Sequence, residues 1–240
     1  AELYNKINNN HSLYLEGQIN VAKNKRHVVS VKEAEQDLIF LIKNNLENQY
    51  LFLVLADFYR STKQYKKAIP YYSKILNKYN LDEDQKWRLL YLRGICYERL
   101  NNWVSAEEDF INSLEINSES PQVLNYLAYG WIERNKFLDR SLKMLQLAYE
   151  KNPDSHYILD SLAWAHFKKN NLIIASELME QVIAKAPGEA ISIDHLGDIY
   201  FAIGRKREAF YMWKQAKDLA NPEDDIIDKL QKKLKKYHAG

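Results

Sequence analysis

The chain has 240 residues, of which 46% are hydrophobic and 28% are charged, and its formal net charge is +2. This composition is typical of a folded globular protein and excludes a disordered chain, while the near-balance of charge gives no indication of nucleic-acid binding. No apolar run approaches the roughly 18 residues that a membrane-spanning helix needs, so we expect no membrane span. The single cysteine, Cys96, excludes an intrachain disulfide.

The first elements in chain order are two irregular helices. The chain begins with Ala-Glu-Leu-Tyr, which has neither Met nor the apolar core of a signal peptide, and we interpret it as processed sequence or a piece of a longer protein. The run from Ser30 to Glu33 has the spacing of a capping box and predicts a helix start. Because Ala34 lies 34 residues before Ala68, we predict an irregular first repeat over residues 12–48.

Five regular segments follow, each with a small residue, an aromatic or His three residues later, and a second small residue twelve or thirteen residues after the first. The first small residues are Ala56, Gly94, Ala128, Ala163 and Gly197, with spacings of 38, 34, 35 and 34 residues. Small residues let two antiparallel helices approach closely, and the aromatic fills the space beside them. Breakers such as Asn152-Pro153 separate the copies. We predict two-helix repeats over 49–86, 87–120, 121–155, 156–189 and 190–221.

The last predicted element is an amphipathic helix over residues 222–237. Ile226, Leu230 and Leu234 form one apolar stripe, and most of the lysines lie toward the end of the segment, where they complement the helix dipole. We expect this helix to cover the apolar face of the last repeat. A basic helix could instead contact nucleic acid or an anionic membrane, but mixed charges and the lack of Arg favour the capping role.

A 34-residue period of two helices with small residues at their crossing resembles the tetratricopeptide repeat (TPR). The resemblance implies an all-α fold, a right-handed superhelix of about six helix pairs with a C-terminal capping helix, in one solenoid domain over residues 1–240. It also implies that the first helix of each pair lines a concave groove, in which TPR proteins bind segments of other proteins.

Catalytic patterns are absent from the sequence, which has no phosphate-binding Gly-rich loop, no H-E-x-x-H and no cysteine cluster. Asp160, Ser161 and His166 suggest a hydrolytic set, but adjacent helical residues point about 100° apart. His166 moreover occupies the aromatic position of its repeat. Cys96 has no neighbouring His or Lys to activate it. We therefore predict a non-enzyme with no catalytic residue, metal or cofactor.

The groove-facing positions of the predicted first helices are aromatic or accept hydrogen bonds. Asn125, Asp160 and Asp194 share one register position, and we expect them to form a ladder that accepts hydrogen bonds from a partner's backbone or its Lys and Arg side chains. Two alternatives stay open: the aromatics pack between repeats, or the polar side chains bridge neighbouring helices. The candidate groove residues are Tyr50, Asp57, Tyr91, Asn125, Tyr129, Tyr157, Asp160, Trp164, Asp194 and Asp198.

Residues 121–236 resemble more narrowly the C-terminal repeats of bacterial envelope TPR proteins, including lipoprotein adaptors of processing proteases. The matching runs are Asn125–Tyr129, Asp160–Trp164 and His195–Asp198. This resemblance implies an adaptor in the bacterial periplasm or cell envelope, although the sequence leaves a cytoplasmic location open. We expect a protein-binding scaffold. The alternative is a spacer or oligomerisation arm, whose groove another copy or residues 1–12 would fill, so a homo-oligomer is also open.

Overall fold

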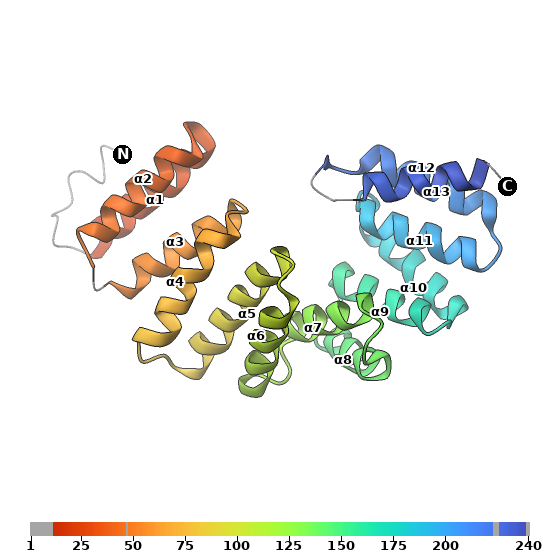
Figure 1. Cartoon of the computed structure of the whole chain (residues 1–240), viewed down its shortest axis with the longest axis horizontal. Coiled ribbons are helices and arrows are strands. Elements are labelled where there is room, and N and C mark those ends of the chain that lie inside the picture. Colours follow the sequence, from red (N-terminus) through yellow and green to blue (C-terminus); the bar gives the residue numbers. More distant parts are fainter. Residues whose placement is uncertain (1–11, 47, 223–225, 239–240) are drawn as a thin grey trace. The chain divides into compact units, whose positions relative to one another are not determined.

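The computed structural model describes residues 12–46, 48–222 and 226–238, and this part of the chain contains thirteen α-helices and no strand (Figure 1). Consecutive helices of the same compact unit contact one another and are joined by short turns, and the predicted all-α solenoid is confirmed. Their bounds are α1 Ser12–Val28, α2 Val31–Lys43, α3 Gln49–Ser61, α4 Tyr65–Lys78, α5 Glu83–Arg99, α6 Trp103–Ile116, α7 Pro121–Glu133, α8 Leu138–Lys151, α9 His156–Lys168, α10 Leu172–Lys185, α11 Ala190–Ala202, α12 Lys206–Leu219 and α13 Ile227–His238.

The helices belong to two compact units, the first ending at Asn117 and the second beginning at Ser118. The first unit contains the pairs α1–α2, α3–α4 and α5–α6, and the second contains α7–α8, α9–α10 and α11–α12 followed by α13. One domain spanning both units stays a prediction. The expectation that residues 1–12 fill a groove falls almost wholly outside the described residues.

The turn inside each regular pair repeats one backbone motif. A residue with positive φ follows the first helix, and the next backbone N–H donates to the carbonyl of the aromatic position, as in a Schellman motif. The N···O distances are 2.8 or 2.9 Å in all five pairs. The residues with positive φ are Lys63, Asn101, Asn135, Asn170 and Gly204, which repeat at 38, 34, 35 and 34 residues.

The small residues lie where paired helices cross. A Cβ on Gly94 would lie 2.7 Å from Phe110 Cε1, and a Cβ on Gly197 would lie 2.5 Å from Trp213 Cδ1. Such distances are too short for any larger side chain unless the ring moves. The equivalent Ala128 is fully buried. The close approach of the two helices therefore depends on these positions.

The aromatic position of each repeat is a packing position, and it also anchors neighbouring pairs. Tyr59 on α3 donates a 2.8 Å hydrogen bond to Glu35 on α2, and Tyr200 on α11 donates one of 2.8 Å to Glu180 on α10. His166 occupies this position on α9 and is buried, which lowers the pKa of its imidazole. Its burial at this position shows that His166 packs within its repeat, as the aromatic residues do in the other repeats.

The C-terminal helix α13 covers the last pair, as the apolar stripe predicts. Ile226 and Leu230 are buried, and Leu234 packs against the same core cluster, which includes Trp213 on α12. Tyr237 stacks on Phe210 with ring centroids 4.9 Å apart. The apolar side of α13 thus closes the core of the second unit.

Candidate functional site

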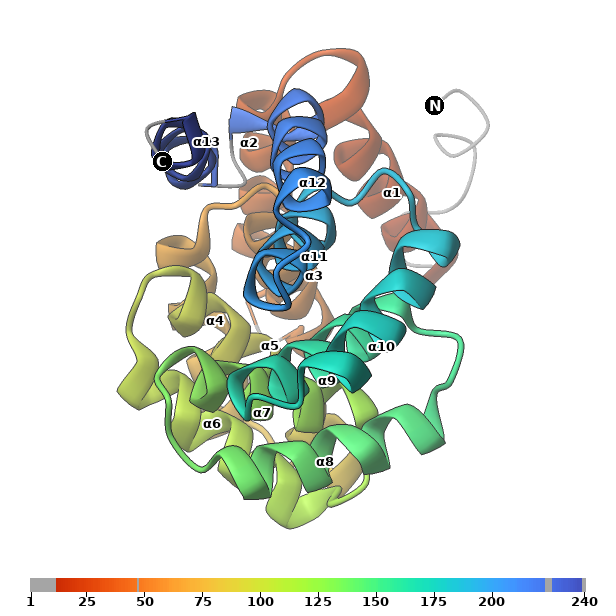
Figure 2. The ribbon, with the colours of Figure 1, turned by 90° about the vertical axis from the view of Figure 1, so that its right-hand side faces the viewer.

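The first helices of the second unit form a continuous wall, because α9 contacts both α7 and α11. The second helix of each pair lies beside its first helix, as Figure 2 shows for α11 and α12. Seven of the ten predicted groove residues lie on this wall. The other three, Tyr50, Asp57 and Tyr91, lie in the first unit, and we describe them separately.

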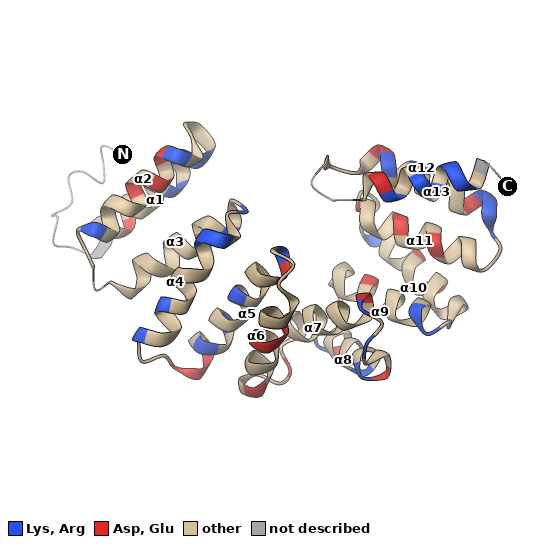
Figure 3. Cartoon of the chain, in the orientation of Figure 1, with Lys and Arg blue, Asp and Glu red and all other residues tan. Residues whose placement is uncertain are grey.

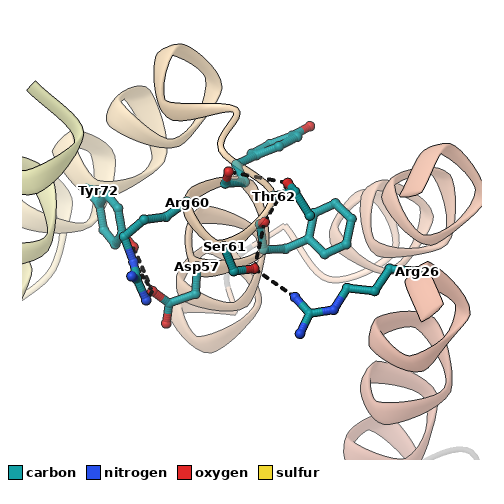
Figure 4. Close-up of polar contacts among 8 residues, drawn as sticks. Arg26, Asp57, Arg60, Ser61, Thr62 and Tyr72 are labelled. Carbon is teal, nitrogen blue, oxygen red and sulfur yellow. Dashed lines mark hydrogen bonds and ion pairs between the residues drawn. The ribbon is translucent and has the colours of Figure 1, made fainter. Parts of the chain in front are cut away.

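In the first unit, Asp57 joins the two helices of its pair (Figure 4). Tyr72 on α4 donates a 2.6 Å hydrogen bond to Asp57 Oδ1, and Arg60 donates to the same oxygen at 3.3 Å. Burial and the neighbouring carboxylate raise the pKa of Tyr72. Arg26 on α1 reaches the same pair of helices by donating a 2.8 Å hydrogen bond to Ser61. Asp57 on α3 therefore bridges to α4 through Tyr72, as the alternative of polar side chains that join neighbouring helices expects.

The two aromatic candidates of the first unit differ in exposure. Tyr50, in the first turn of α3, is 51% exposed. Tyr91 on α5 is half-buried and contacts the Phe110 ring at a centroid distance of 6.3 Å. Cys96 on the same helix is fully buried, and burial raises the pKa of its thiol to about 12, so it is protonated at neutral pH. Tyr50 is the better placed of the two aromatics to touch a partner.

On the wall of the second unit, Asp160 on α9 and His195 on α11 form a buried pair. Asp160 Oδ1 lies 3.0 Å from His195 Nδ1. Burial disfavours the imidazolium, but the carboxylates of Asp160, Asp194 and Asp198 outweigh it and raise the pKa of His195 above its ordinary value. Asp160 Oδ2 is buried and has no hydrogen-bond partner among the described residues.

Trp164 lies against this pair and is itself buried. Its indole ring stacks on His195 at a centroid distance of 4.0 Å and on Phe167 at 4.7 Å. Its Nε1 donates a 2.7 Å hydrogen bond to Glu133 on α7. The side chain is 6% exposed. Trp164 thus joins three successive first helices, which is the packing role that the sequence left open.

Asp194 and Asp198 on α11 receive a lysine from the C-terminal helix. Lys233 Nζ lies 2.5 Å from Asp194 Oδ1 and 2.7 Å from Asp198 Oδ1. Trp213 Nε1 donates to Asp198 at 3.0 Å. Burial raises the pKa of Asp194 despite the ammonium group of Lys233 beside it. The two carboxylates on α11 are therefore paired with a lysine of the same chain.

Sequence reasoning missed Lys233 and His195, although a register signal exists for the lysine. Tyr129, Trp164, Asp198 and Lys233 follow one another at 35, 34 and 35 residues. The C-terminal helix thus continues the register of the first helices, and its lysine falls in the column of groove positions. The apolar stripe and the charge of this helix do not by themselves reveal that register.

The predicted ladder is brought together in space only in part. Asp160 and Asp194 are 7% and 6% exposed, and each contacts a basic side chain of the next helix along the wall, which is the bridging alternative. Asn125 on α7 is half-buried, and its Oδ1 has no hydrogen-bond partner in the described part of the chain. A further role of these three side chains in holding a partner's backbone stays a prediction.

The exposed part of the wall is apolar and aromatic. Tyr157 and Ile191 are 59% and 42% exposed and lie 34 residues apart, at one register position of α9 and α11. The Tyr157 hydroxyl interacts with Glu189, which together with partial burial raises its pKa. Tyr129 on α7 is half-buried against the neighbouring core cluster. These side chains offer contact area that the fold itself leaves uncovered.

Across residues 12–46, 48–222 and 226–238, no group of three His, Cys, Asp or Glu side chains is placed to hold a metal ion. Among the same residues, no helix combines the length and the apolar character that crossing a membrane requires.

Comparisons with known proteins find repeats of one type. The tetratricopeptide-repeat family model matches residues 50–77. A TPR repeat-containing protein of Pseudomonas aeruginosa is 26% identical over 148 residues, which make up 62% of this chain and 24% of that protein. The chain thus spans about a quarter of the length of this curated relative.

Solved structures share the fold at low sequence identity. A tetratricopeptide repeat protein from Parabacteroides merdae aligns with a TM-score of 0.69 and 22% identity, covering 95% of this chain and 86% of that one. YrrB, a TPR protein with an unusual peptide-binding site, aligns with a TM-score of 0.56 and 21% identity, covering 82% of this chain and 98% of that one. At these identities the likeness is one of fold.

Proposed function

Because the chain is a tetratricopeptide-repeat protein, we propose that it is a non-catalytic scaffold that binds an extended segment of a partner protein. The fold supports protein–protein interaction in general. We place the binding surface of the second unit on the wall formed by α7, α9 and α11.

One observation carries this proposal: the wall leaves aromatic and aliphatic side chains exposed at matching register positions. Tyr157 and Ile191 lie on contacting helices and are 59% and 42% exposed. Single exposed apolar residues are common, but a repeated position on stacked helices forms a continuous surface. Aromatic side chains bring large contact area at a low entropic cost, which is why they are enriched in binding surfaces.

The buried polar side chains of the wall have a positioning role in this proposal. Asp160, His195 and Trp164 fix α9 against α11, so they hold the register on which Tyr157 and Ile191 depend. Asn125 Oδ1 is buried without a hydrogen-bond partner among the described residues, so its side chain must rotate outward before it can accept a hydrogen bond from a partner that approaches α7. Tyr50 is the corresponding exposed aromatic in the first unit.

The test is affinity capture from a lysate with three baits. The baits are the wild-type chain, a Tyr157→Ala/Ile191→Ala variant, and a control Tyr211→Ala/Leu219→Ala variant that removes equally exposed apolar side chains from α12. We expect a partner retained by the wild type and the control to be lost with the first variant. An identical catch from all three baits would place the binding surface elsewhere.

The finer role, that of an adaptor in a bacterial cell envelope or for a protease, also belongs to this proposal. Its support is the resemblance of residues 121–236 to envelope TPR proteins, and the Pseudomonas aeruginosa protein adds only that a bacterial protein has similar repeats. Identification of the captured partner tests it directly, because an envelope protein or a protease in the catch is expected and a set of unrelated cytoplasmic proteins contradicts it.

A further inference from the structure

The C-terminal helix carries a basic stripe on the side that faces solvent. Lys229, Lys232 and Lys236 follow one another at i, i+3 and i+7, so they share one face of α13, and all three are exposed. No hydrogen bond or ion pair joins them to another residue that the structure describes. Lys233, on the buried side of the helix, differs because it is held by two carboxylates.

Helix α6 in the first unit carries an acidic stripe with exposed aliphatic residues. Val104, Glu108, Ile111 and Glu115 follow one another at i, i+4, i+7 and i+11, which places all four on one face. Val104 is 78% exposed and Ile111 is 37% exposed, and both glutamates are exposed. Neither glutamate forms an ion pair within the described part of the chain. Figure 3 shows the acidic residues along α6.

The two stripes match in spacing and in charge. Glu108 and Glu115 are seven residues apart, as are Lys229 and Lys236, so each pair spans about 10.5 Å along its helix. Two helices laid side by side can therefore place both ammonium groups on both carboxylates. The methylene stems of the lysines would then cover the exposed parts of Val104 and Ile111.

From this match we infer that the basic stripe of one copy binds the acidic stripe of a second copy. The inference goes beyond the proposed function, because neither stripe belongs to the wall of α7, α9 and α11. The contact joins different surfaces on the two copies, so it is heterologous and each copy has a free stripe at either end. The association is expected to grow beyond the dimer as protein concentration rises.

The chemistry of the contact also predicts a weak, salt-sensitive association. Exposed ion pairs contribute little singly, and Lys binds carboxylates as a point charge rather than through a bidentate fork. At 1 M salt the Debye length falls to about 3 Å, and the attraction is screened.

The test uses sedimentation velocity of the full chain with charge reversals. One variant is Glu108→Lys/Glu115→Lys and the other is Lys229→Glu/Lys236→Glu, and all four positions are exposed, so folding should be unaffected and is checked by circular dichroism. A matched control, Lys214→Glu/Lys217→Glu, makes the same change in net charge as the lysine reversal at exposed lysines of α12, outside the stripe.

We expect the wild type and the control to show a mass that rises with concentration at low salt, and each reversal alone to stay monomeric. A mixture of the two reversals should associate again, because each then presents the charge that the other lacks. A wild type that is monomeric at every concentration in low salt overturns the inference. So does association that persists in both reversals or in 1 M salt.

Discussion

At the positive-φ position that recurs in the five turns, Lys63 is the one residue poorly suited to its backbone. It has φ of 59°, and the equivalent residues of the other four pairs are three asparagines and one glycine. The left-handed region costs an ordinary L-residue about 1–2 kcal/mol, whereas Gly adopts it freely and Asn tolerates it. The turn is thus fixed by the Schellman hydrogen bonds of the helix end rather than by the preference of the residue.

We predict that Lys63→Gly stabilises the chain by roughly 0.5–1 kcal/mol, because relief of the backbone strain exceeds the added flexibility of the unfolded state. Urea unfolding followed by circular dichroism measures the change. Lys86→Gly, at an exposed position past the first turn of α5, is the matched control and should destabilise by about 1 kcal/mol. Equal effects at the two positions would contradict the explanation.

His195 is a residue whose charge should contribute to stability. Its pKa is raised in the folded state, so the contribution is fully present below the unfolded value of about 6.5 and is lost as pH rises through the folded pKa. We predict that the free energy of unfolding of the wild type falls from about pH 6 to alkaline pH.

The control for this pH prediction is His195→Gln, which removes the titrating group and keeps a hydrogen-bond donor for Asp160. Chemical unfolding of both proteins across the pH range gives two slopes, and the wild type should lose more stability than the variant. Since burial lowers the pKa of His166, that residue contributes with the opposite sign in both proteins and cancels in the comparison. Parallel pH profiles would show that His195 is not the cause.

At the scale of elements, α13 serves as both an apolar cover and an electrostatic partner. Leu230 is fully buried in the last core cluster, and Lys233 neutralises Asp194 and Asp198 on α11. A terminal repeat must protect its apolar face from water, and this helix does so while it continues the register of the first helices. The two contacts together fix its position along α11 and α12.

We predict that Lys233→Met destabilises the second unit by about 1–3 kcal/mol, because two carboxylates, one of them buried, lose their cation. Met keeps most of the apolar stem, so the change isolates the charge. Lys232→Met, at the exposed neighbouring position, should change stability by less than about 0.5 kcal/mol. The urea midpoints of the two variants measure this difference. Equal midpoints would mean that only the apolar stripe holds α13 in place.

At the scale of the whole molecule, stability in a repeat protein comes from contacts between neighbouring elements. The two units have separate compact cores, one built around residues such as Phe52 and Tyr59 and the other around residues such as Ile193 and Trp213. A defect in one core should therefore be felt mainly within its own unit.

We predict that Trp164→Ala costs the second unit roughly 3–5 kcal/mol, because a buried indole and its hydrogen bond to Glu133 are lost. Amide hydrogen exchange should accelerate in α9 to α12 and stay unchanged in α3 and α4. Acceleration in both units to the same extent would show that they unfold together. This variant thus tests packing, and the exposed Tyr157 is the better position for testing binding.

The sequence by itself determined the elements of this protein. The 34-residue period, the small residues at the helix crossings, the capping box at Ser30 and the apolar stripe of the last helix all act over short distances along the chain. Each has a local physical cause, in close helix approach, satisfaction of a helix end or burial of one face, so it can be recognised without knowledge of the fold. The lack of catalytic motifs can also be recognised from the sequence, because such motifs are short patterns along the chain.

Only the tertiary structure decided which polar side chains are already engaged. Asp160 and His195 are 35 residues apart, and Asp194 and Lys233 are 39 apart, so neither pair follows from a local pattern. The sequence assigned the ladder residues to one register position, but it could not distinguish a carboxylate that faces solvent from one that faces a basic side chain of the next helix. That distinction depends on the stacking of successive repeats, because burial makes such a pairing necessary and only the stack supplies the partner.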